Sequence, residues 1–433
     1  MADRRAVAQL HRLMRWLDAF KPCFGRRAQV VALRRYVQGL LSDSPRKSMD
    51  AMLARVTDPG CYQAFQHFIT DAPWAAEAVW KRLRAIVPER AGWLILDGTS
   101  FPKQGPHSVG VARQYCGALG KVANCQVATT VALWTGVRAY LLGARLYLPE
   151  VWLTAAARAR ARIPTTVRFQ EKWRHALTLV RQVRASGITV TGVLADAEFG
   201  DVTAFRTALH RWGLAYAVGI SSQHTVFRGH PALVPPPSTL RGRPRTRPTL
   251  PSGTRPEPVA ALVAAARWRT IRWRNRRDTR AWAAQFTALR VTPAHDWRQR
   301  RLAPEVWLLA ERDRGATPRT KFYFVHLPAT ASLRQLVRLA HQRWAIEQQY
   351  QELKTELGFD HFEGRTFPGW HHHVVLSALA YNFLQAERRR ATAWLTFPQI
   401  RAIVQEIFTA LLFAQRPDYL QRIESLKTVQ LRI

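Results

Sequence analysis

The spacing of apolar residues changes along this 433-residue chain. Up to about residue 88 they recur every three or four positions, as in Leu10, Leu13 and Leu17, which predicts amphipathic helices. From Gly92 onward, β-branched and apolar runs separated by glycines predict strands, and helices then alternate with strands up to about residue 213. The pattern therefore predicts an α/β fold, a mixed sheet with helices, preceded by an all-helical N-terminal region.

Downstream of this region the pattern becomes strand-like but irregular, and it contains a Pro- and Arg-rich tract, residues 235–258, that is expected to be a solvated loop. Helical spacing returns at Ser332, and we expect one helix from there to about Gly358. The expected segments are the helical N-terminal region, a first α/β part, a β-rich insertion, a second α/β part and a helical C-terminal tail, at residues 1–88, 89–213, 214–328, 329–391 and 392–433.

Three acidic residues lie where the pattern suggests a reactive site. Asp97 closes the apolar run 93–96, Asp196 closes the run 188–195, and Glu347 lies on the predicted buried face of the helix that begins at Ser332. Two carboxylates at strand ends and one on a helix supply the oxygen ligands that Mg²⁺ prefers. The sequence therefore predicts a site for a hard divalent cation.

Each of these residues also has a simpler interpretation. Asp97 followed by Gly98 is a good turn, and Asp201 is an alternative acid close to Asp196. We favour Asp196 over Asp201 because ligands gather where strands end. An i, i+4 ion pair between Arg343 and Glu347 on a solvated helix face is the alternative for the third acid.

Basic residues share the helix of the third acid. At about 100° per residue, Arg343, Glu347 and Lys354 fall on one side of it. If Glu347 holds a metal ion, Arg343 and Lys354 are placed to contact phosphate oxygens.

The net charge indicates the partner. Lys and Arg number 65 against 29 Asp and Glu, which gives +36, and such a surface calls for a polyanion, DNA or RNA. No run of 18 apolar residues is present, so we expect no membrane partner, and four scattered cysteines argue against a zinc site and fit a reducing cytosol.

Two further motifs are weaker signals. Arg241, Arg243 and Arg245, in the sequence RGRPR, have the form of a segment that enters an A·T minor groove, although a loop that contacts phosphates is the simpler interpretation. The three consecutive histidines, His371, His372 and His373, point in three directions on a helix, so we do not expect them to bind a metal together.

Three blocks of sequence resemble a known family. The blocks LDGTSFPKQG, VLADAEFGD and RWAIEQQYQELKTELGFDHFEGR are similar to those of DDE transposases of bacterial insertion sequences, in the insertion sequence 701 branch related to the insertion sequence 4 group. That group also carries a Tyr-Arg-Glu-Lys pattern. Arg343, Glu347 and Lys354 match it, but Ala340 stands at the Tyr position.

The resemblance implies an RNase H-like catalytic core interrupted by the β-rich insertion, with a DNA-binding N-terminal region. It implies that Asp97, Asp196 and Glu347 are catalytic and hold two Mg²⁺ or Mn²⁺ ions. It also implies double-stranded DNA partners (terminal inverted repeats and target DNA), a homodimer on paired ends, and a bacterial cytoplasmic, nucleoid-associated protein.

The expected activity is cleavage of the element's ends and their joining to target DNA by phosphoryl transfer. Two alternatives keep the same core. One is a catalytically silent DNA-binding regulator of transposition, and the other is a structure-specific nuclease that cuts without joining.

Overall fold

A computed structural model of the chain describes residues 2–56, 60–235, 248–273, 282–295, 297, 301–313, 315, 318–391 and 395–415. The chain divides into two compact units. Unit 1 comprises Met1–Ala91, Gly98–Thr189 and Ala345–Ile433, and unit 2 comprises Gly92–Asp97 and Val190–Trp344. Strand β1 (Ala91–Pro102) contributes residues to both units.

Unit 1 begins with helices, as the spacing of apolar residues predicts. They are α1 (Ala2–Asp18), η1 (Lys21–Cys23), α2 (Arg27–Leu41), α3 (Met49–Leu53), α4 (Tyr62–Thr70) and α5 (Ala76–Ile86). Its later elements are β2 (Ala112–Cys116), β3 (Lys121–Trp134), β4 (Ala139–Leu146), η2 (Glu150–Leu153), α6 (Ala155–Ala161), α7 (Lys172–Ala185), α12 (Trp344–Leu357), α13 (Phe367–Arg390) and α14 (Phe397–Gln415).

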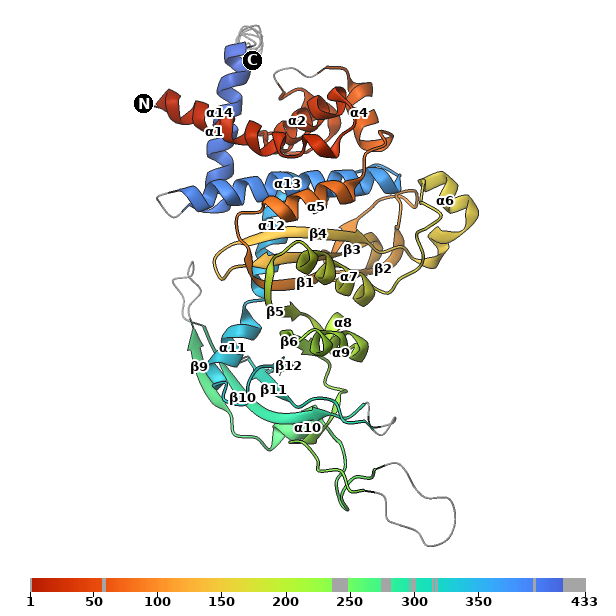
Figure 1. Cartoon of the computed structure of the whole chain (residues 1–433), viewed down its shortest axis with the longest axis vertical. Coiled ribbons are helices and arrows are strands. Elements are labelled where there is room, and N and C mark those ends of the chain that lie inside the picture. The colour runs from red at the N-terminus through yellow and green to blue at the C-terminus, as the bar shows by residue number, and fades with distance from the viewer. Residues whose placement is uncertain are drawn as a thin grey trace, which may run out of the picture. The chain divides into compact units, whose positions relative to one another are not determined.

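The central element of unit 1 is α13. It lies between the N-terminal helices α2 and α4 on one side and strand β4 on the other, and α5 contacts both α13 and β4 (Figure 1). Its residues are buried on almost every side, as expected for a helix without a polar face. Asn382 on this helix donates from Nδ2 to the carbonyl of Leu141 on β4 at 2.7 Å and accepts from the Leu141 N–H at 3.0 Å. The N-terminal helices, α13 and β4 therefore share one hydrophobic core.

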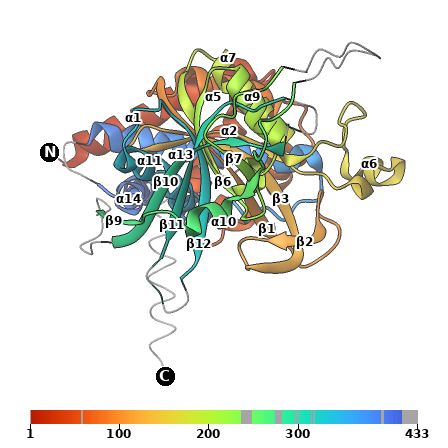
Figure 2. The ribbon, with the colours of Figure 1, turned by 90° about the horizontal axis from the view of Figure 1, so that it is seen from below.

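Unit 2 consists mainly of strands. Its elements are β5 (Thr189–Ala195), α8 (Ala197–Gly200), α9 (Thr203–Arg211), β6 (Ala215–Ile220), β7 (Thr225–Arg228), β8 (Glu257–Pro258), α10 (Val259–Ala264), β9 (Arg269–Trp273), β10 (Trp282–Pro293), β11 (Val306–Arg312), β12 (Thr320–His326) and α11 (Leu333–His341). Strands β6, β12, β11 and β10 lie side by side (Figure 2). The β5–β6 pair is parallel, whereas the pairs from β6 through β12 and β11 to β10 are antiparallel. The strands therefore form a mixed sheet, in which β1 lies between β3 and β5.

Two details differ from the prediction. Asp97 lies inside β1 rather than at its end, because Gly98 and the buried residues Thr99 and Ser100 continue the strand. The helix expected from Ser332 to Gly358 is two helices, α11 and α12, and Gln342 ends the first by donating its N–H to the carbonyl of Leu339 at 3.1 Å. Because α12 is a separate helix from α11, Glu347 does not lie on the helix face that the sequence predicts for it.

No helix among the described residues is both long and apolar enough to cross a membrane.

Candidate active site

Asp97 is held by a basic residue from the end of unit 2. Its side chain is only 12% exposed, and its Oδ2 lies 3.2 Å from the Nη1 of Arg343 in an ion pair. Arg343 follows the C-terminal end of α11, so this helix places the guanidinium over β1. The buried carboxylate is thereby compensated by a cation, as burial of a charge requires.

Asp196 directly follows β5, as the sequence predicts, and begins the short helix α8. Its Oδ1 accepts a hydrogen bond from the N–H of Glu198 at 3.0 Å, which makes it the N-cap. Burial raises the pKa of Asp196, while the charge of Arg343 opposes that rise. Asp97 and Asp196 thus stand on neighbouring strands and both interact with the charge of Arg343.

Asp201, the alternative acid, is used for a different contact. Its Oδ1 accepts a hydrogen bond from the N–H of Ser221 at 2.7 Å and lies 2.9 Å from Nε2 of His224. The carboxylate therefore connects the end of α8 to the loop that follows β6. The sequence does not indicate His224 or Ser221 as partners of Asp201, because partners 20 or more residues away leave no local pattern.

Glu347 lies in the first turn of α12 and is exposed, so the prediction that it faces the core is wrong. The buried face of α12 is formed by Ala345, Ile346, Gln349, Glu352, Leu353 and Leu357. Glu347 lies beside that face rather than on it. The prediction assumes one continuous helix, in which Glu347 lies on the same face as Leu336 and Leu339. The helix ends at Gln342, so the residues of α12 do not continue the face of α11.

Lys354 is half-buried and holds α12 in place within unit 1. Its Nζ donates to the backbone carbonyl of Ser100 at 2.9 Å and lies 5.7 Å from the centre of the Phe101 ring. Burial lowers the pKa of Lys354. Tyr350, one turn earlier, shares a 2.6 Å hydrogen bond between its hydroxyl and that of Thr130 on β3. The phosphate contact expected for Lys354 would compete with this structural role.

The acidic residues fit a divalent cation by their chemistry. Asp97 and Asp196 offer carboxylate oxygens on adjacent strands, and the Arg343 guanidinium shows that a positive charge is stabilised there. Across the described part of the chain, no three His, Cys, Asp or Glu side chains are grouped closely enough to hold a metal ion.

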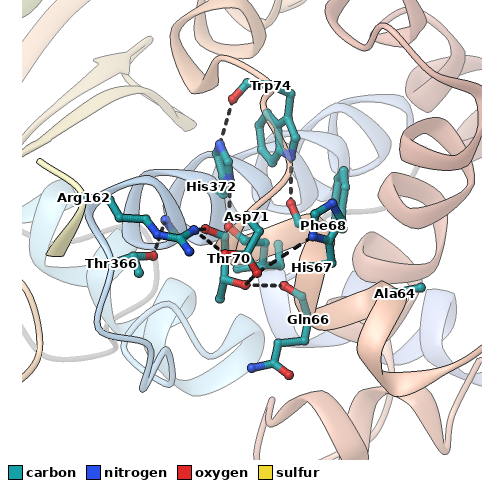
Figure 3. A network of polar contacts seen from close by, with 12 residues as sticks. Ala64, Gln66, His67, Phe68, Thr70, Asp71, Trp74, Arg162, Thr366 and His372 are labelled. Atoms are coloured by element: carbon teal, nitrogen blue, oxygen red, sulfur yellow. Dashed lines mark hydrogen bonds and ion pairs between the residues drawn. The ribbon is translucent and has the colours of Figure 1, made fainter. Parts of the chain in front are cut away.

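The three consecutive histidines serve the core of unit 1. Nδ1 of His372 lies 2.7 Å from the carbonyl of Ile69 and Nε2 lies 2.8 Å from that of Trp74, while the ring stacks on the Trp74 indole with centroids 3.6 Å apart (Figure 3). Both acceptors are satisfied together only by a doubly protonated ring. The pKa of His372 is nevertheless lowered, because burial outweighs the two carbonyls, which raise it. This residue joins α13 to the segment between α4 and α5.

His373 has the opposite requirement. Its Nε2 lies 3.1 Å from the carbonyl of Gly358, and its Nδ1 lies 2.8 Å from the hydroxyl of Tyr36. A neutral ring with the proton on Nε2 donates to the carbonyl and accepts from the hydroxyl, so it satisfies both contacts. Burial accordingly lowers the pKa of His373 to about 4.

His373 should make stability depend on pH. In the unfolded chain histidine titrates near pH 6.5, so between about pH 6.5 and 4 the unfolded state binds a proton that the folded state does not. The free energy of unfolding should therefore fall as the pH drops through this window, by up to about 3 kcal/mol from this residue. Denaturant unfolding of the wild type and of His373→Gln at several pH values measures the difference, and equal slopes would contradict the assignment.

Arg241, Arg243 and Arg245 lie outside the described residues. No position is therefore assigned to the basic segment at the centre of the Pro- and Arg-rich tract.

Comparisons with known proteins place the chain in a family. The sequence pattern of the DDE superfamily endonucleases matches residues 19–280, which include Asp97 and Asp196 but not Glu347. A "Probable transposase for insertion sequence element IS701" from Microchaete diplosiphon is 31% identical over 194 residues, which are 43% of this chain and 48% of that protein. The chain thus spans about half the length of this relative.

One solved structure, the synaptic complex of the piggyBac transposase with hairpin DNA, matches 91% of this chain and 73% of that chain, with a TM-score of 0.41 and 9% identity. Similarity at this level says nothing about the activity of the present chain. The match to the family pattern covers more than half of the sequence, and the chain belongs to the DDE superfamily endonucleases.

Proposed function

We propose that this chain is a DNA transposase that binds the ends of an insertion sequence, cuts them and joins them to target DNA. The observation that supports this most is the pair of carboxylates, Asp97 and Asp196, on neighbouring strands with the charge of Arg343 beside both. Both acids lie within the segment that matches the endonuclease family. The net charge of +36 supplies the attraction to a phosphate backbone.

The proposed metal ligands are Asp97, Asp196 and Glu347, which would hold two Mg²⁺ or Mn²⁺ ions. When bound, such ions activate an attacking oxygen and stabilise the charge on a leaving oxygen. Glu347 enters this set through the family resemblance and through its place one helical turn after Arg343.

The residues of the chain itself have three tasks. The carboxylates provide negative charge that a cation would neutralise, and Arg343 forms an ion pair with Asp97. With a cation held by the carboxylates, the Arg343 guanidinium would be available to a phosphate oxygen, which its planar fork binds well. Lys354 is proposed as the second phosphate contact, which it would make in exchange for its hydrogen bond to the carbonyl of Ser100.

We propose the domain roles from the resemblance as well. Residues 89–213 and 329–391 would form an RNase H-like core, and residues 214–328 would be its β-rich insertion. The β5–β6 pair is parallel, whereas the pairs β7–β10, β10–β11 and β11–β12 are antiparallel. This change from parallel to antiparallel pairing within residues 214–328 supports the proposed insertion. Residues 1–88 would bind the terminal repeats, and a homodimer would hold paired ends.

The assay that tests this function uses labelled duplexes taken from the DNA on either side of the gene, together with Mg²⁺ or Mn²⁺ and a supercoiled target. We expect metal-dependent cleavage at an inverted repeat, followed by covalent joining of the cleaved 3′ end to the target. Cleavage without joined products would favour the structure-specific nuclease. Repeat-specific binding without cleavage, under either metal, would favour the silent regulator.

A further inference from the structure

The carboxylate of Asp196 is presented by a helix too short to set its own geometry. Helix α8 has four residues, and the conformational entropy lost in forming a single helical turn exceeds the stabilisation from its hydrogen bonds. Its position must therefore be imposed by the residues around it. Those residues lie on β6, in the segment that follows it and on α9, within unit 2.

Two glycines let α8 lie directly against the backbone of β6. A Cβ added to Gly200 would be 1.8 Å from the carbonyl oxygen of Gly219, and a Cβ added to Gly219 would be 3.0 Å from the N of Ala197. Neither glycine has a positive φ, so the reason for glycine at both positions is space rather than backbone conformation. A side chain at Gly219 would press on the peptide that joins Asp196 to Ala197.

The other end of α8 is fixed by polar contacts. Asp201, its C-cap, accepts from the N–H of Ser221 at 2.7 Å and from Nε2 of His224 at 2.9 Å, and both partners follow β6. Because a carboxylate only accepts, the His224 proton lies on Nε2. Arg206, which is buried, donates to the carbonyl of Gly200 and places its guanidinium 5.3 Å from the centre of the Phe324 ring.

We propose that the Asp201–His224 pair and the Gly200–Gly219 contact position the Asp196 carboxylate for metal binding. This inference rests on the proposed function, in which Asp196 is a metal ligand. None of these groups is a catalytic residue. They act through Asp196, as residues around a metal site orient its ligands, and loss of such a partner typically lowers metal affinity by about 10- to 100-fold.

The test measures Mn²⁺ binding to the full-length protein without DNA, by the electron paramagnetic resonance signal of the free ion. Asp201→Ala, which removes both hydrogen bonds, should weaken binding by about 10-fold or more. Asp201→Asn should bind almost as the wild type does, because its amide oxygen accepts from the same two donors. Gly219→Ala should weaken binding like Asp201→Ala.

The matched control is Gly315→Ala, in the same unit, where the added Cβ would meet, among the residues that the structure describes, only the Oδ1 of Asp313 at 3.7 Å. Its Mn²⁺ affinity should equal that of the wild type. Circular dichroism of every variant establishes that it is folded. Asp201 is 38% exposed, so its two variants keep the test available even if Gly219→Ala does not fold.

Asp196→Asn separates this inference from the proposed function. If Asp196→Asn binds Mn²⁺ as tightly as the wild type, the metal-ligand role itself fails. If Asp196→Asn loses binding while Asp201→Ala and Gly219→Ala retain it, the positioning role is overturned and the proposed function stands. Equal losses in Asp201→Ala and Asp201→Asn would also overturn it, because the hydrogen bonds would then not be the cause.

Discussion

Asp97→Asn and Asp196→Asn are each expected to lower metal-dependent cleavage by about 10³-fold or more, since a lost metal ligand removes several kcal/mol of transition-state stabilisation at about 1.36 kcal/mol per tenfold. The amide keeps the shape and the hydrogen-bond acceptor of each carboxylate. Asp97→Asn can still accept from Arg343, and Asp196→Asn can still cap α8. Folding and binding of the terminal repeat should therefore persist.

Single-turnover cleavage of a labelled terminal-repeat duplex measures this loss, and a gel-shift titration of the same duplex measures binding. Asp201→Asn is the matched control, because it makes the same chemical change five residues from Asp196 and retains its acceptor. It should keep most of the activity. Cleavage by Asp97→Asn or Asp196→Asn at near the wild-type rate would remove that carboxylate from the metal site.

Much of the secondary structure around these residues follows from local sequence. The run before Asp196 is β-branched and apolar and ends at an acid that also caps a helix, so β5 and its end were predictable. The N-terminal helices follow from three- and four-residue spacing, which a single buried face imposes. In each case the residues that determine the helix or strand lie within that helix or strand.

The differences arise where distant residues decide. The Asp97–Gly98 pair resembles a turn, yet β1 continues through it. The strand lies between β3 and β5, which supply partners for its backbone hydrogen bonds, and Thr99 and Ser100 are buried. Nothing in the sequence near Gln342 breaks a helix in the way that proline or glycine would. The contacts of α12 are instead set by its partners in unit 1, such as Thr130 and Ser100.

Because Glu347 is exposed, its substitution tests its catalytic role without disturbing the core. An acid in the first turn of a helix is favoured by the helix dipole by about 0.3–1 kcal/mol, which alone explains a glutamate there. On that interpretation Glu347→Gln would change cleavage little. If Glu347 completes the metal site, the same substitution should lower cleavage by about 10³-fold or more, as a lost ligand does. The protein should remain folded in either case, because an exposed side chain contributes little to the core.

Glu356→Gln provides the control for Glu347→Gln on the same helix. Glu356 forms an ion pair with Arg401, in which its Oε2 lies 3.1 Å from the Nη1 of Arg401. It has no part in the proposed chemistry. We expect Glu356→Gln to cut the terminal-repeat duplex at close to the wild-type rate. Glu347→Gln should bind the duplex normally, cut it very slowly and need a higher Mg²⁺ concentration for half-maximal cleavage. If both variants cut equally well, the third acid of the site must be sought elsewhere in the chain, and the resemblance that selected Glu347 would not extend to its catalytic role.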